Sequence, residues 1–452
     1  MESAALSFDK GSILIRGEVR TPYGTWDDRA RAFRAQALYY KEILEYLRRS
    51  QLPFKDSVQD PPPCPMLTST LQMRGYQTNA LKAWDEASRR GVIVLPTGAG
   101  KTMIAIKAIS VVNESSIIVV PTLDLLEQWK SRLEKELNIP VGAFGGGDSV
   151  LRAVTVSTYD SAYLRASEIG NKFAFIVFDE VHHLPAEGYR QIAEMFTAPY
   201  RMGLTATFER EDLLHREIPR LVGGVVFRLK PADLAGGYLS EYTLQRIGTD
   251  LTDEEKVEYE KYRRAYVDYI TSRGIRISNP LEFKRFIMRS GRDKEAREAL
   301  LARNKAMAIA FNSKAKIDAL EEILGSSPED RVLIFTQHNE LVYRISRRFL
   351  LPYITHRSSK DERAEILRNF REGTYRAVVT SKVLDEGIDV PEASLGVIVS
   401  GTGSSREFVQ RLGRLLRKKE GKQAKLIELV SRETSETRTS WRRKRSKTEG
   451  AL

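Results

Sequence analysis

The sequence predicts an α/β protein with two parallel-sheet units, a small α+β unit before them and a helical insertion. Short apolar runs alternate with helical patterns from residue 71 to about residue 229, and the alternation resumes at residue 314. A charged helical region of about residues 252–311 separates these two stretches. Strands that alternate with helices are typical of parallel sheets covered by helices on both faces.

The first 65 residues predict a small unit of their own. Residues 12–19 have the composition of a strand, and one amphipathic helix is expected from about residue 28 to residue 49. Apolar residues recur at helical spacing in that stretch at Phe33, Ala37, Tyr40, Leu44 and Leu47. Residues 61–65 then contain four prolines in five positions, which neither a helix nor a central strand accommodates. We therefore expect a stiff linker and a domain boundary here.

Nine short apolar runs predict the strands of the two larger sheets. They are residues 91–95, 116–120, 153–157, 173–178 and 201–205 in the first unit, and 331–336, 375–380, 395–400 and 424–430 in the second. These positions divide the chain into domains at 1–65, 66–232 and 233–452, with the insertion at about 252–311 inside the third domain.

The predicted insertion carries a stripe of tyrosines at Tyr259, Tyr262, Tyr266 and Tyr269. Their helical spacing is typical of side chains that face a core. Between Phe283 and Lys305 there are eight lysines and arginines against three acidic residues. That surplus is either an ordinary solvated helix face or a surface that grips phosphates, and the sequence leaves both interpretations open.

The composition favours a nucleic-acid partner. The 452 residues carry a formal net charge of +12, which favours polyanions and nucleic acid first. No apolar stretch approaches the ~18 residues of a membrane span, and the N-terminus has no signal-peptide pattern. Cys64 is the only cysteine, so no internal disulfide forms, and five histidines disfavour a histidine-based metal site. We expect a cytoplasmic, nucleoid-associated protein without membrane or disulfide partners.

The clearest chemical motif follows the strand predicted at 91–95. It consists of Pro96, Thr97, Gly98, Ala99, Gly100, Lys101 and Thr102, and an apolar helical pattern comes directly after it. The glycines let backbone N–H groups wrap around phosphate oxygens, and the helix N-terminus adds positive potential. Lys101 is expected to reach the β- and γ-phosphates of a nucleotide, and the Thr102 hydroxyl to bind Mg²⁺. The motif departs from the usual pattern where Leu95 stands in place of a glycine.

Two acidic residues follow the strand predicted at 173–178, at the sheet edge where α/β proteins bind ligands. We expect this strand beside the one that carries the phosphate loop. Asp179 would then hold Mg²⁺ through water, and Glu180 would orient and deprotonate the attacking water. His182 is expected to relay the state of the nucleotide through a hydrogen bond, and His183 receives no role.

These motifs occur in the order found in superfamily 2 helicases, which the chain resembles. Besides Lys101, the resemblance rests on D-E-V-H at 179–182, L-T-A-T at 204–207, a motif-V-like stretch at 380–391 and a motif-VI-like stretch at 410–417. Residues 74–77, R-G-Y-Q, resemble the adenine-reading R-x-Y-Q element. The matched motifs span residues 74–417, most of the chain.

Within that group the chain resembles the XPB family, and archaeal members in particular. The triplet Arg210, Glu211 and Asp212 comes just after the T-A-T motif, as in that family. Residues 404–407, S-S-R-E, are also XPB-like. A helical thumb-like insertion and a small N-terminal damage-recognition-like domain fit the same family, the latter only by position and size.

The resemblance implies two RecA-like domains that clamp ATP, with Mg²⁺ as the metal. The catalytic residues that it implies are Lys101, Asp179, Glu180, His182, Gln410, Arg414 and Arg417. The residues implied to bind ATP are Arg74, Gln77, Pro96, Thr97, Gly98, Ala99, Gly100, Lys101, Thr102, Gly387 and Asp389, and Thr102 and Asp179 would bind the metal. Arg414 and Arg417 would stabilise charge on the γ-phosphoryl group in the transition state.

The resemblance also implies contacts to DNA. The residues implied to bind or unwind it are Pro121, Thr122, Ser157, Thr158, Arg210, Glu211, Asp212, Thr336 and Gln337. Contacts to the phosphate backbone read no sequence, so binding should be salt-sensitive and largely independent of sequence. The Arg-Glu-Asp triplet would act near the duplex junction, although a surface ion-pair cluster is the simpler interpretation of these residues alone.

The expected function is that of an ATP-dependent 3′–5′ DNA helicase or translocase that opens duplex DNA in nucleotide excision repair, with a role in transcription left open. Its partners would be forked or damaged DNA and, by family resemblance, a nuclease. A restriction-system or RNA-sensing superfamily 2 motor is an alternative, against which the Arg-Glu-Asp triplet argues. A non-catalytic nucleic-acid scaffold is another, against which the intact Lys101, Glu180 and Arg414 argue. A metabolic phosphate-loop kinase would leave the second α/β unit unexplained.

Overall fold

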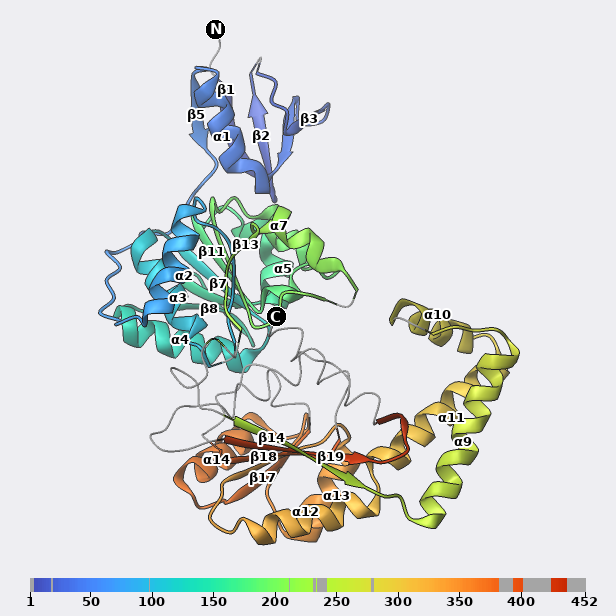
Figure 1. The fold of residues 1–452 in the computed structure, drawn as a ribbon. Coiled ribbons are helices and arrows are strands. Elements are labelled where there is room, and N and C mark those ends of the chain that lie inside the picture. The colour runs from blue at the N-terminus through green and yellow to red at the C-terminus, as the bar shows by residue number, and fades with distance from the viewer. Residues whose placement is uncertain are drawn as a thin grey trace. The chain divides into compact units, whose positions relative to one another are not determined.

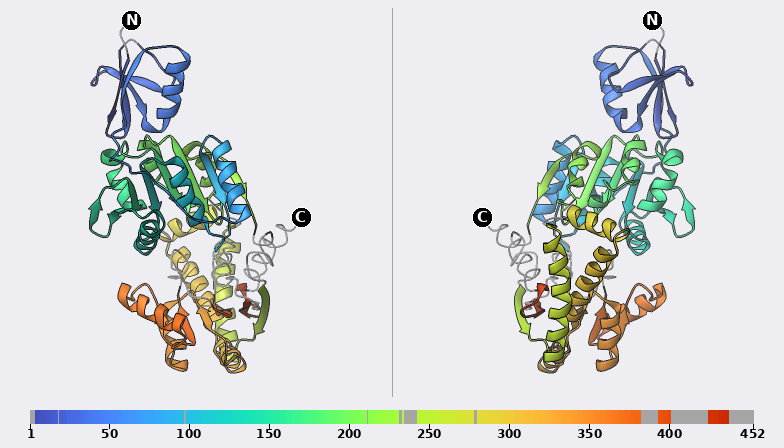
Figure 2. Two further views of the ribbon diagram at one scale, coloured as in Figure 1. Left: turned by 90° about the vertical axis from the view of Figure 1, so that its left-hand side faces the viewer. Right: turned by 90° about the vertical axis from the view of Figure 1, so that its right-hand side faces the viewer.

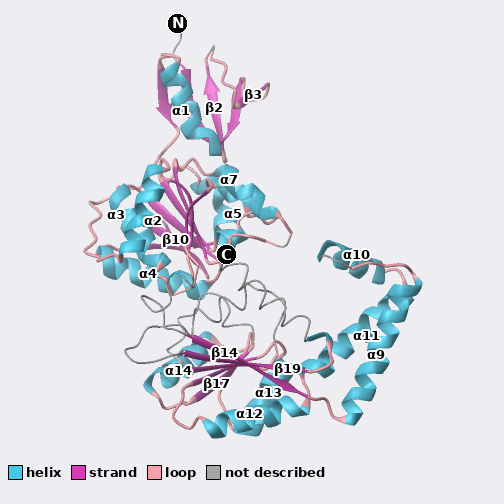
Figure 3. Cartoon of the chain, in the orientation of Figure 1, coloured by secondary structure: helices cyan, strands magenta, loops and turns pink. Residues whose placement is uncertain are grey.

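The computed structural model of the protein forms two compact units, Met1–Leu229 and Lys230–Leu452. The structure describes residues 4–17, 19–96, 98–210, 212–230, 233, 242–277, 280–381, 393–400 and 424–436. Figure 1 labels the elements, and Figure 3 distinguishes helices, strands and loops. Each unit contains a parallel sheet with its helices, as predicted, and the first unit also contains a smaller sheet.

A five-stranded sheet with one main helix forms the N-terminal part of the first unit. Its strands are β1 (Ala4–Asp9), β2 (Ser12–Arg16), β3 (Gly24–Asp27), β4 (Ala32–Gln36) and β5 (Phe54–Ser57), in the order β3-β4-β2-β1-β5. A 3₁₀ turn, η1 (Ala37–Tyr39), leads into helix α1 (Tyr40–Arg49). Ile43 and Leu47 of α1 belong to one buried cluster with Ile13 and Ile15 of β2, so α1 covers one face of this sheet.

The helix predicted from residue 28 is wrong over its first half. Residues 32–36 form β4, which pairs antiparallel with both β2 and β3. Phe33 of β4 packs edge-on against Trp26 of β3, with ring centroids 5.3 Å apart. Cross-strand partners are distant in sequence, so pairing of this kind is invisible to local spacing and overrides it. The helix therefore begins only at Tyr40.

An eight-stranded sheet forms the larger part of the first unit. Its strands are β6 (Arg90–Val94), β7 (Ser116–Val120), β8 (Gly142–Gly145), β9 (Asp148–Val150), β10 (Val154–Thr158), β11 (Phe175–Asp179), β12 (Tyr200–Thr205) and β13 (Val225–Arg228). Their order is β13-β6-β12-β11-β7-β10-β8-β9, and all neighbours are parallel except the β8–β9 pair. The accompanying helices are α2 (Gly75–Glu86), α3 (Lys101–Val112), α4 (Leu123–Leu137), α5 (Tyr159–Ile169), α6 (Arg190–Met195) and α7 (Ile218–Leu221), with 3₁₀ turns η2 (Val181–His183) and η3 (Leu214–Glu217).

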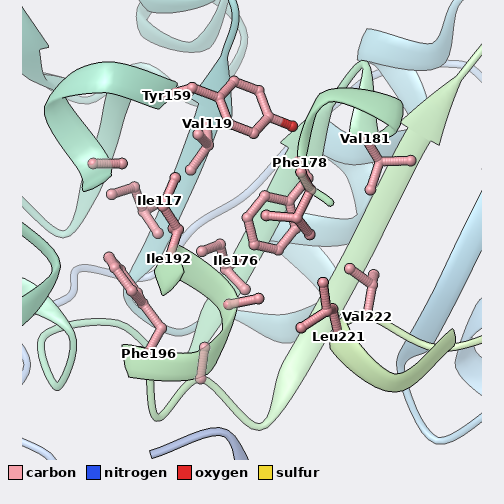
Figure 4. Close-up of a cluster of buried hydrophobic side chains, with 14 of the residues drawn as sticks. Ile117, Val119, Tyr159, Ile176, Phe178, Val181, Ile192, Phe196, Leu221 and Val222 are labelled. Atoms are coloured by element: carbon pink, nitrogen blue, oxygen red, sulfur yellow. The ribbon is translucent and has the colours of Figure 1, made fainter. Parts of the chain in front are cut away.

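The connections place helices on both faces of this sheet. The chain advances along the sheet from β6 through α3 to β7 and through α4 to β8. After β9 it returns to β10, and through α5 to β11. Because such crossovers are right-handed, α3 and α4 cover one face while α5 and α7 cover the other, as Figure 1 shows, and α6 packs beside α5 and α7. The core beneath α5 and α6 joins Ile176 and Phe178 of β11 to Tyr159, Ile192 and Phe196 (Figure 4).

The N-terminal sheet is bonded to the amino ends of these parallel strands. Arg90, the first residue of β6, forms an ion pair of 2.6 Å with Glu42 of α1. Asn171 donates its side-chain amide to the carbonyl of Val58 at 3.0 Å and accepts the backbone N–H of Asp60 at 3.0 Å. The predicted linker is thus anchored at its start, on the side of the sheet opposite the phosphate loop.

A six-stranded parallel sheet forms the second unit. Its strands are β14 (Tyr242–Thr249), β15 (Val332–Phe335), β16 (Tyr353–Ile354), β17 (Ala377–Thr380), β18 (Leu395–Ile398) and β19 (Ala424–Ser431), in the order β14-β19-β18-β15-β17-β16. The helices around it are α12 (Lys314–Ser326), α13 (Asn339–Phe349) and α14 (Lys360–Glu372). All four strands predicted for this unit are present. The two edge strands, β14 and β16, were not predicted.

The helical insertion is confirmed as α9 (Asp253–Ser272), α10 (Pro280–Ser290) and α11 (Lys294–Phe311). The helices α9 and α11 pack against each other and run side by side in the views of Figure 2. Tyr259 is buried with Ala306 and Ala310, and Tyr266 and Tyr269 pack around Phe286, so the tyrosine stripe faces the core of the insertion. In the described part of the chain, no helix has both the length and the apolarity needed to cross a membrane.

A buried polar cluster fastens the insertion to the sheet of the second unit. Lys316 of α12 donates to both carboxylate oxygens of Glu436 at 2.7 Å and to the carbonyl of Val399 at 2.9 Å. The adjacent backbone N–H of Ser435 donates to the hydroxyl of Tyr259 at 2.8 Å. The segment after β19 therefore ties α9 to α12.

Candidate nucleotide and DNA site

The phosphate loop joins the end of β6 to the start of α3. Gly98 and Gly100 both have left-handed backbone conformations, with φ values of 85° and 77°. Side chains with a Cβ rarely adopt that conformation, so glycine is required for the loop to turn here. Lys101 is the first residue of α3, and its ammonium donates to the carbonyl of Leu95 at 3.3 Å. Lys101 thus bonds back to the start of the loop at Leu95, the position where the usual motif has a glycine.

Helix α2 holds the loop from one side. The hydroxyl of Tyr76 donates to the carbonyl of Ala99 at 2.7 Å, and the side-chain amide of Gln77 donates to the same carbonyl at 3.0 Å. The amide oxygen of Gln77 accepts the backbone N–H of Arg74 at 2.8 Å. The predicted Arg74 and Gln77 are therefore joined to the loop. Tyr76, quoted only as part of the motif, is a third support that the sequence did not single out.

The two acids lie at the carboxyl edge of the same sheet as the phosphate loop. The expectation that their strand lies directly beside β6 is wrong, because β12 lies between β6 and β11. The carboxyl ends of all three parallel strands still share one edge, so the crossover leaves the acids on the side of the phosphate loop. Glu180 has a left-handed backbone with φ of 48°, a strained conformation that is concentrated at functional sites.

Lys101 and the two acids form one electrostatic unit. Burial, followed by the adjacent carboxylate of Glu180, raises the pKa of Asp179 to about 6. Burial also acts to raise the pKa of Glu180, but the ammonium of Lys101 and the imidazole of His182 outweigh it and lower that pKa. Glu180 therefore stays ionised to lower pH than Asp179, and its carboxylate is free of a proton, as a general base must be.

A hydroxyl from β12 connects Glu180 to His182. The hydroxyl of Thr205 lies 3.3 Å from a carboxylate oxygen of Glu180 and 3.0 Å from Nδ1 of the buried His182. It also accepts the backbone N–H of Thr207 at 3.1 Å. This arrangement supports the predicted relay through His182. Thr205 is a central member of it that the sequence showed only as part of L-T-A-T.

Two aromatic residues outside every motif bond to Asp179. The indole N–H of Trp129, on α4, donates to a carboxylate oxygen of Asp179 at 2.8 Å. The hydroxyl of Tyr159, on α5, donates to the backbone carbonyl of Asp179 at 3.1 Å. Both side chains are almost completely buried. No local signal in the sequence marks them, because their partner is 50 and 20 residues away.

Arg210, of the Arg-Glu-Asp triplet, is bonded to the loop that carries the acids. The guanidinium of Arg210 forms an ion pair of 2.6 Å with Asp212 and also donates to the backbone carbonyl of His182. Its backbone N–H donates to the ring of His215 at 3.1 Å. The ion pair agrees with the interpretation of these residues as a surface ion-pair cluster. The bond to His182 is more than that interpretation requires, because it joins Arg210 to the loop that carries the acids.

The predicted DNA contacts of the first unit lie at two helix starts. Thr122 caps α4 by accepting the N–H of Leu125, and Thr158 caps α5 by accepting the N–H of Ser161. Pro121 directly precedes the first cap. Ser157 is completely buried, so its side chain has no direct access to a DNA phosphate in this conformation.

In the second unit, Thr336 and Gln337 follow the carboxyl end of β15. The hydroxyl of Thr336 is buried and donates to the carbonyl of His338 at 2.9 Å, while Ser400 accepts the N–H of Gln337 at 2.9 Å. The remaining predicted positions lie outside the described residues: Thr97, Glu211, Gly387, Asp389, Gln410, Arg414 and Arg417.

The side chains present fit a nucleotide with Mg²⁺. Two left-handed glycines and the start of α3 flank Lys101, and the half-buried Thr102 stands one residue into the helix. In the described ranges, no cluster of three or more His, Cys, Asp or Glu could hold a metal alone. Mg²⁺ is typically held by one or two protein oxygens together with substrate phosphates, so Thr102 and Asp179 suffice.

Comparison with protein families matches three stretches of the chain. Residues 6–58 match the model described as the xeroderma pigmentosum group B helicase damage recognition domain. Residues 70–210 match the model described as type III restriction enzyme, res subunit, and residues 315–419 match the helicase conserved C-terminal domain.

Comparison with individual proteins adds two relatives and one structure. The chain is 45% identical to the "DNA 3'-5' translocase XPB2" of Sulfurisphaera tokodaii over 97% of its own length and 99% of that protein. It is 26% identical to the Danio rerio protein "General transcription and DNA repair factor IIH helicase/translocase subunit XPB", covering 89% of the chain but only 50% of that protein. The Hef helicase domain of Pyrococcus furiosus has a similar fold, with a TM-score of 0.53 and 20% identity over 82% of this chain and 98% of that one.

Proposed function

This chain belongs to the XPB family of DNA helicases, and we propose that it is an ATP-driven 3′–5′ DNA translocase that opens duplex DNA during nucleotide excision repair. The observation that carries the proposal is the joint electrostatic unit of Lys101, Asp179 and Glu180 at one sheet edge. A relic binding scaffold would have no reason to keep a strained glutamate with a lowered pKa beside a phosphate-loop lysine.

ATP binding would use the phosphate loop of the first unit. Lys101 would exchange its bond to the Leu95 carbonyl for the β- and γ-phosphates, and backbone N–H groups at Gly98 and Gly100 would surround the phosphates. Thr102 and Asp179 would hold Mg²⁺, which supplies charge neutralisation on the phosphates. Gln77 would keep the loop in register through its bond to Ala99, and Arg74 would support it through Gln77.

Glu180 would act as the general base. Its lowered pKa leaves it ionised, and Thr205 and His182 fix its carboxylate, so it can orient a water molecule and accept its proton. The backbone of Glu180 is already in a strained conformation, so the geometry is prepared before substrate arrives.

The second RecA-like domain would complete the reaction. By family resemblance, Arg414 and Arg417 stabilise charge on the γ-phosphoryl group, Gln410 senses it, and Gly387 and Asp389 face the nucleotide. We retain the domain assignment 1–65, 66–232 and 233–452, with the insertion at about 252–311.

DNA would be held mainly by its phosphate backbone. Pro121, Thr122 and Thr158 stand at the starts of helices α4 and α5, where N–H groups and helix dipoles favour phosphate. Thr336 and Gln337 would contribute from the second domain. Damage recognition would belong to residues 1–65, and a nuclease partner would cut the opened strand.

The test is a set of assays on the full chain with single-stranded, forked and lesion-bearing DNA and with RNA as control. We expect ATP hydrolysis that DNA stimulates, strand displacement with 3′–5′ polarity, and a loss of hydrolysis of about 10²–10⁴-fold in Glu180→Gln. Glu180→Gln should still bind ATP. Stimulated hydrolysis that survives this substitution would contradict the catalytic assignment.

A motor of the restriction type is the second candidate, because residues 70–210 match a family model named for such enzymes. The same assays separate the two: a restriction-type motor should translocate on intact duplex without preference for a fork or a lesion. Preference for RNA would instead favour an RNA-sensing motor.

A further inference from the structure

We propose that Trp129 and Tyr159 are positioning residues that couple DNA binding to Asp179, and that this coupling makes ATP hydrolysis DNA-stimulated. The inference deepens the function proposed above and rests on it. It assigns roles to two residues that lie outside every helicase motif quoted above.

Trp129 joins one predicted DNA loop to the metal-holding carboxylate. Its indole N–H lies 2.8 Å from the carboxylate of Asp179, and the indole is only 2% exposed. Trp129 lies on α4, about two turns after Thr122, the cap residue that the DNA backbone is expected to contact. A rigid helix of 15 residues thus has a phosphate-binding end and, on its inner face, a donor to Asp179.

Tyr159 makes the equivalent connection from the other predicted DNA loop. It is the first residue of α5 and directly follows the cap Thr158. Its hydroxyl donates to the backbone carbonyl of Asp179 at 3.1 Å. In Figure 4 its ring lies at the rim of the buried cluster, with the hydroxyl oxygen turned toward the end of the strand that carries Phe178.

These two bonds reach Asp179 from opposite faces of the sheet. The helices α4 and α5 lie on different faces, and β11 passes between them. The carboxylate of Asp179 also accepts the backbone N–H of the adjacent Glu180 at 3.1 Å. The backbone of Asp179 is held by its pairing with Leu204 of β12 and by Tyr159, and Trp129 is the side chain that holds its carboxylate. A small shift of either helix on DNA binding would change where the carboxylate meets the metal.

The simpler interpretation is that both aromatics only satisfy buried polar groups. Trp84 offers a matched control for it. Trp84 is also completely buried, and its indole N–H donates to the carbonyl of Arg201 at 2.9 Å, at the amino end of the sheet, away from Asp179. A phenylalanine at this position removes the same atoms without touching the route from α4 to Asp179.

The experiment measures coupling rather than activity. In the full chain, the dissociation constant of a fluorescent, non-hydrolysable ATP analogue with Mg²⁺ is measured with and without single-stranded DNA, and that of DNA with and without the analogue. Thermodynamic linkage requires that DNA change the affinity for the analogue by the same factor by which the analogue changes the affinity for DNA, which provides an internal check. The variants are Trp129→Phe, Tyr159→Phe, their double mutant and the control Trp84→Phe, and thermal midpoints establish that each is folded.

The coupling ratio is the dissociation constant of the analogue without DNA divided by that with DNA. We expect it to be the same in the wild type and in Trp84→Phe. In Trp129→Phe and in Tyr159→Phe it should be lower by roughly fivefold or more. Because both residues act on one carboxylate, the double mutant should lose less than the product of the two effects. If Trp129→Phe does not fold, the smaller change in Tyr159→Phe carries the test.

Three results would overturn the inference. A wild-type coupling ratio in both Trp129→Phe and Tyr159→Phe would overturn the inference while leaving the proposed function intact. An equal loss in Trp84→Phe would do so by showing general loosening of the fold. Absence of any DNA or nucleotide binding by the wild type would refute the proposed function itself, and the inference with it.

Discussion

Arg210 donates a hydrogen bond to the backbone carbonyl of His182 and is held in place by a 2.6 Å ion pair with Asp212. His182 in turn contacts Thr205, whose hydroxyl lies 3.3 Å from Glu180. A continuous series of bonds therefore runs from Glu180, the proposed general base, to Arg210 and Asp212. Such a series is a route by which the state of the nucleotide could reach the DNA-opening segment.

We predict that replacing Arg210, Glu211 and Asp212 by alanine lowers strand displacement more than ATP hydrolysis, by a further factor of about ten. That factor corresponds to the loss of one charge-assisted hydrogen bond. Both rates are measured on forked DNA. Arg220→Ala, which removes an exposed ion-pair cluster with Glu194 and Glu217 in the same unit, is the control. An equal loss of both rates would place the triplet in the motor core or in folding instead.

Gly100→Ala should weaken ATP binding by about tenfold or more. Its backbone is left-handed, with φ of 77°, and an added Cβ would lie 2.4 Å from the amide nitrogen of Gln77. The Gln77 side chain would have to shift, and the strained left-handed backbone would displace the loop, so that its N–H groups would be less well placed for the phosphates. Titration calorimetry with an ATP analogue measures the change. Gly325→Ala is the control, because no atom lies within 4 Å of its added Cβ. Unchanged affinity in Gly100→Ala would contradict the assigned loop.

The affinity for Mg²⁺ with nucleotide should fall as the pH is lowered through about 6, the raised pKa of Asp179. Burial is the main cause of this rise, and a raised carboxyl pKa means that protonation favours the folded, ligand-free protein. That contribution to stability is complete below the ordinary value of 3.8 and is lost as the pH rises through about 6. Metal binding requires the ionised form and so opposes protonation. Fluorescence titrations across this pH range should show the fall in affinity. Asp179→Asn should bind Mg²⁺ with nucleotide weakly at every pH, with no change near pH 6.

Glu436→Gln should lower the free energy of unfolding of the second unit by about 3–5 kcal/mol, because it leaves the ammonium of Lys316 buried beside a neutral group. Both side chains of this pair are almost fully buried. Urea unfolding measures the loss. Lys256→Ala removes the exposed pair with Glu433 and should change stability by less than about 1 kcal/mol. A similar small effect in both variants would mean that water reaches Lys316.

Much of the fold could be predicted because each signal was local. The run at 173–178 is apolar throughout and the run at 116–120 is apolar after Ser116, as is typical of strands buried on both faces, and both became central strands. The helix predicted from residue 28 failed because Phe33 satisfies a helical spacing while its actual partners are on β2 and β3. The placement of β12 between β6 and β11 was missed for a related reason, since strand order depends on crossovers that local patterns do not encode.

The sequence by itself determined which chemical groups meet at the site: glycines that can turn left-handed, the amine of Lys101, and two carboxylates at the end of one strand, which we propose as base and metal ligand. Residue type and short spacing suffice for these, because each depends on the neighbouring backbone. Only the tertiary structure decided what surrounds Asp179. Trp129 and Tyr159 reach it from helices on opposite faces of the sheet, and a contact made across a sheet depends on how whole elements pack rather than on any spacing along the chain.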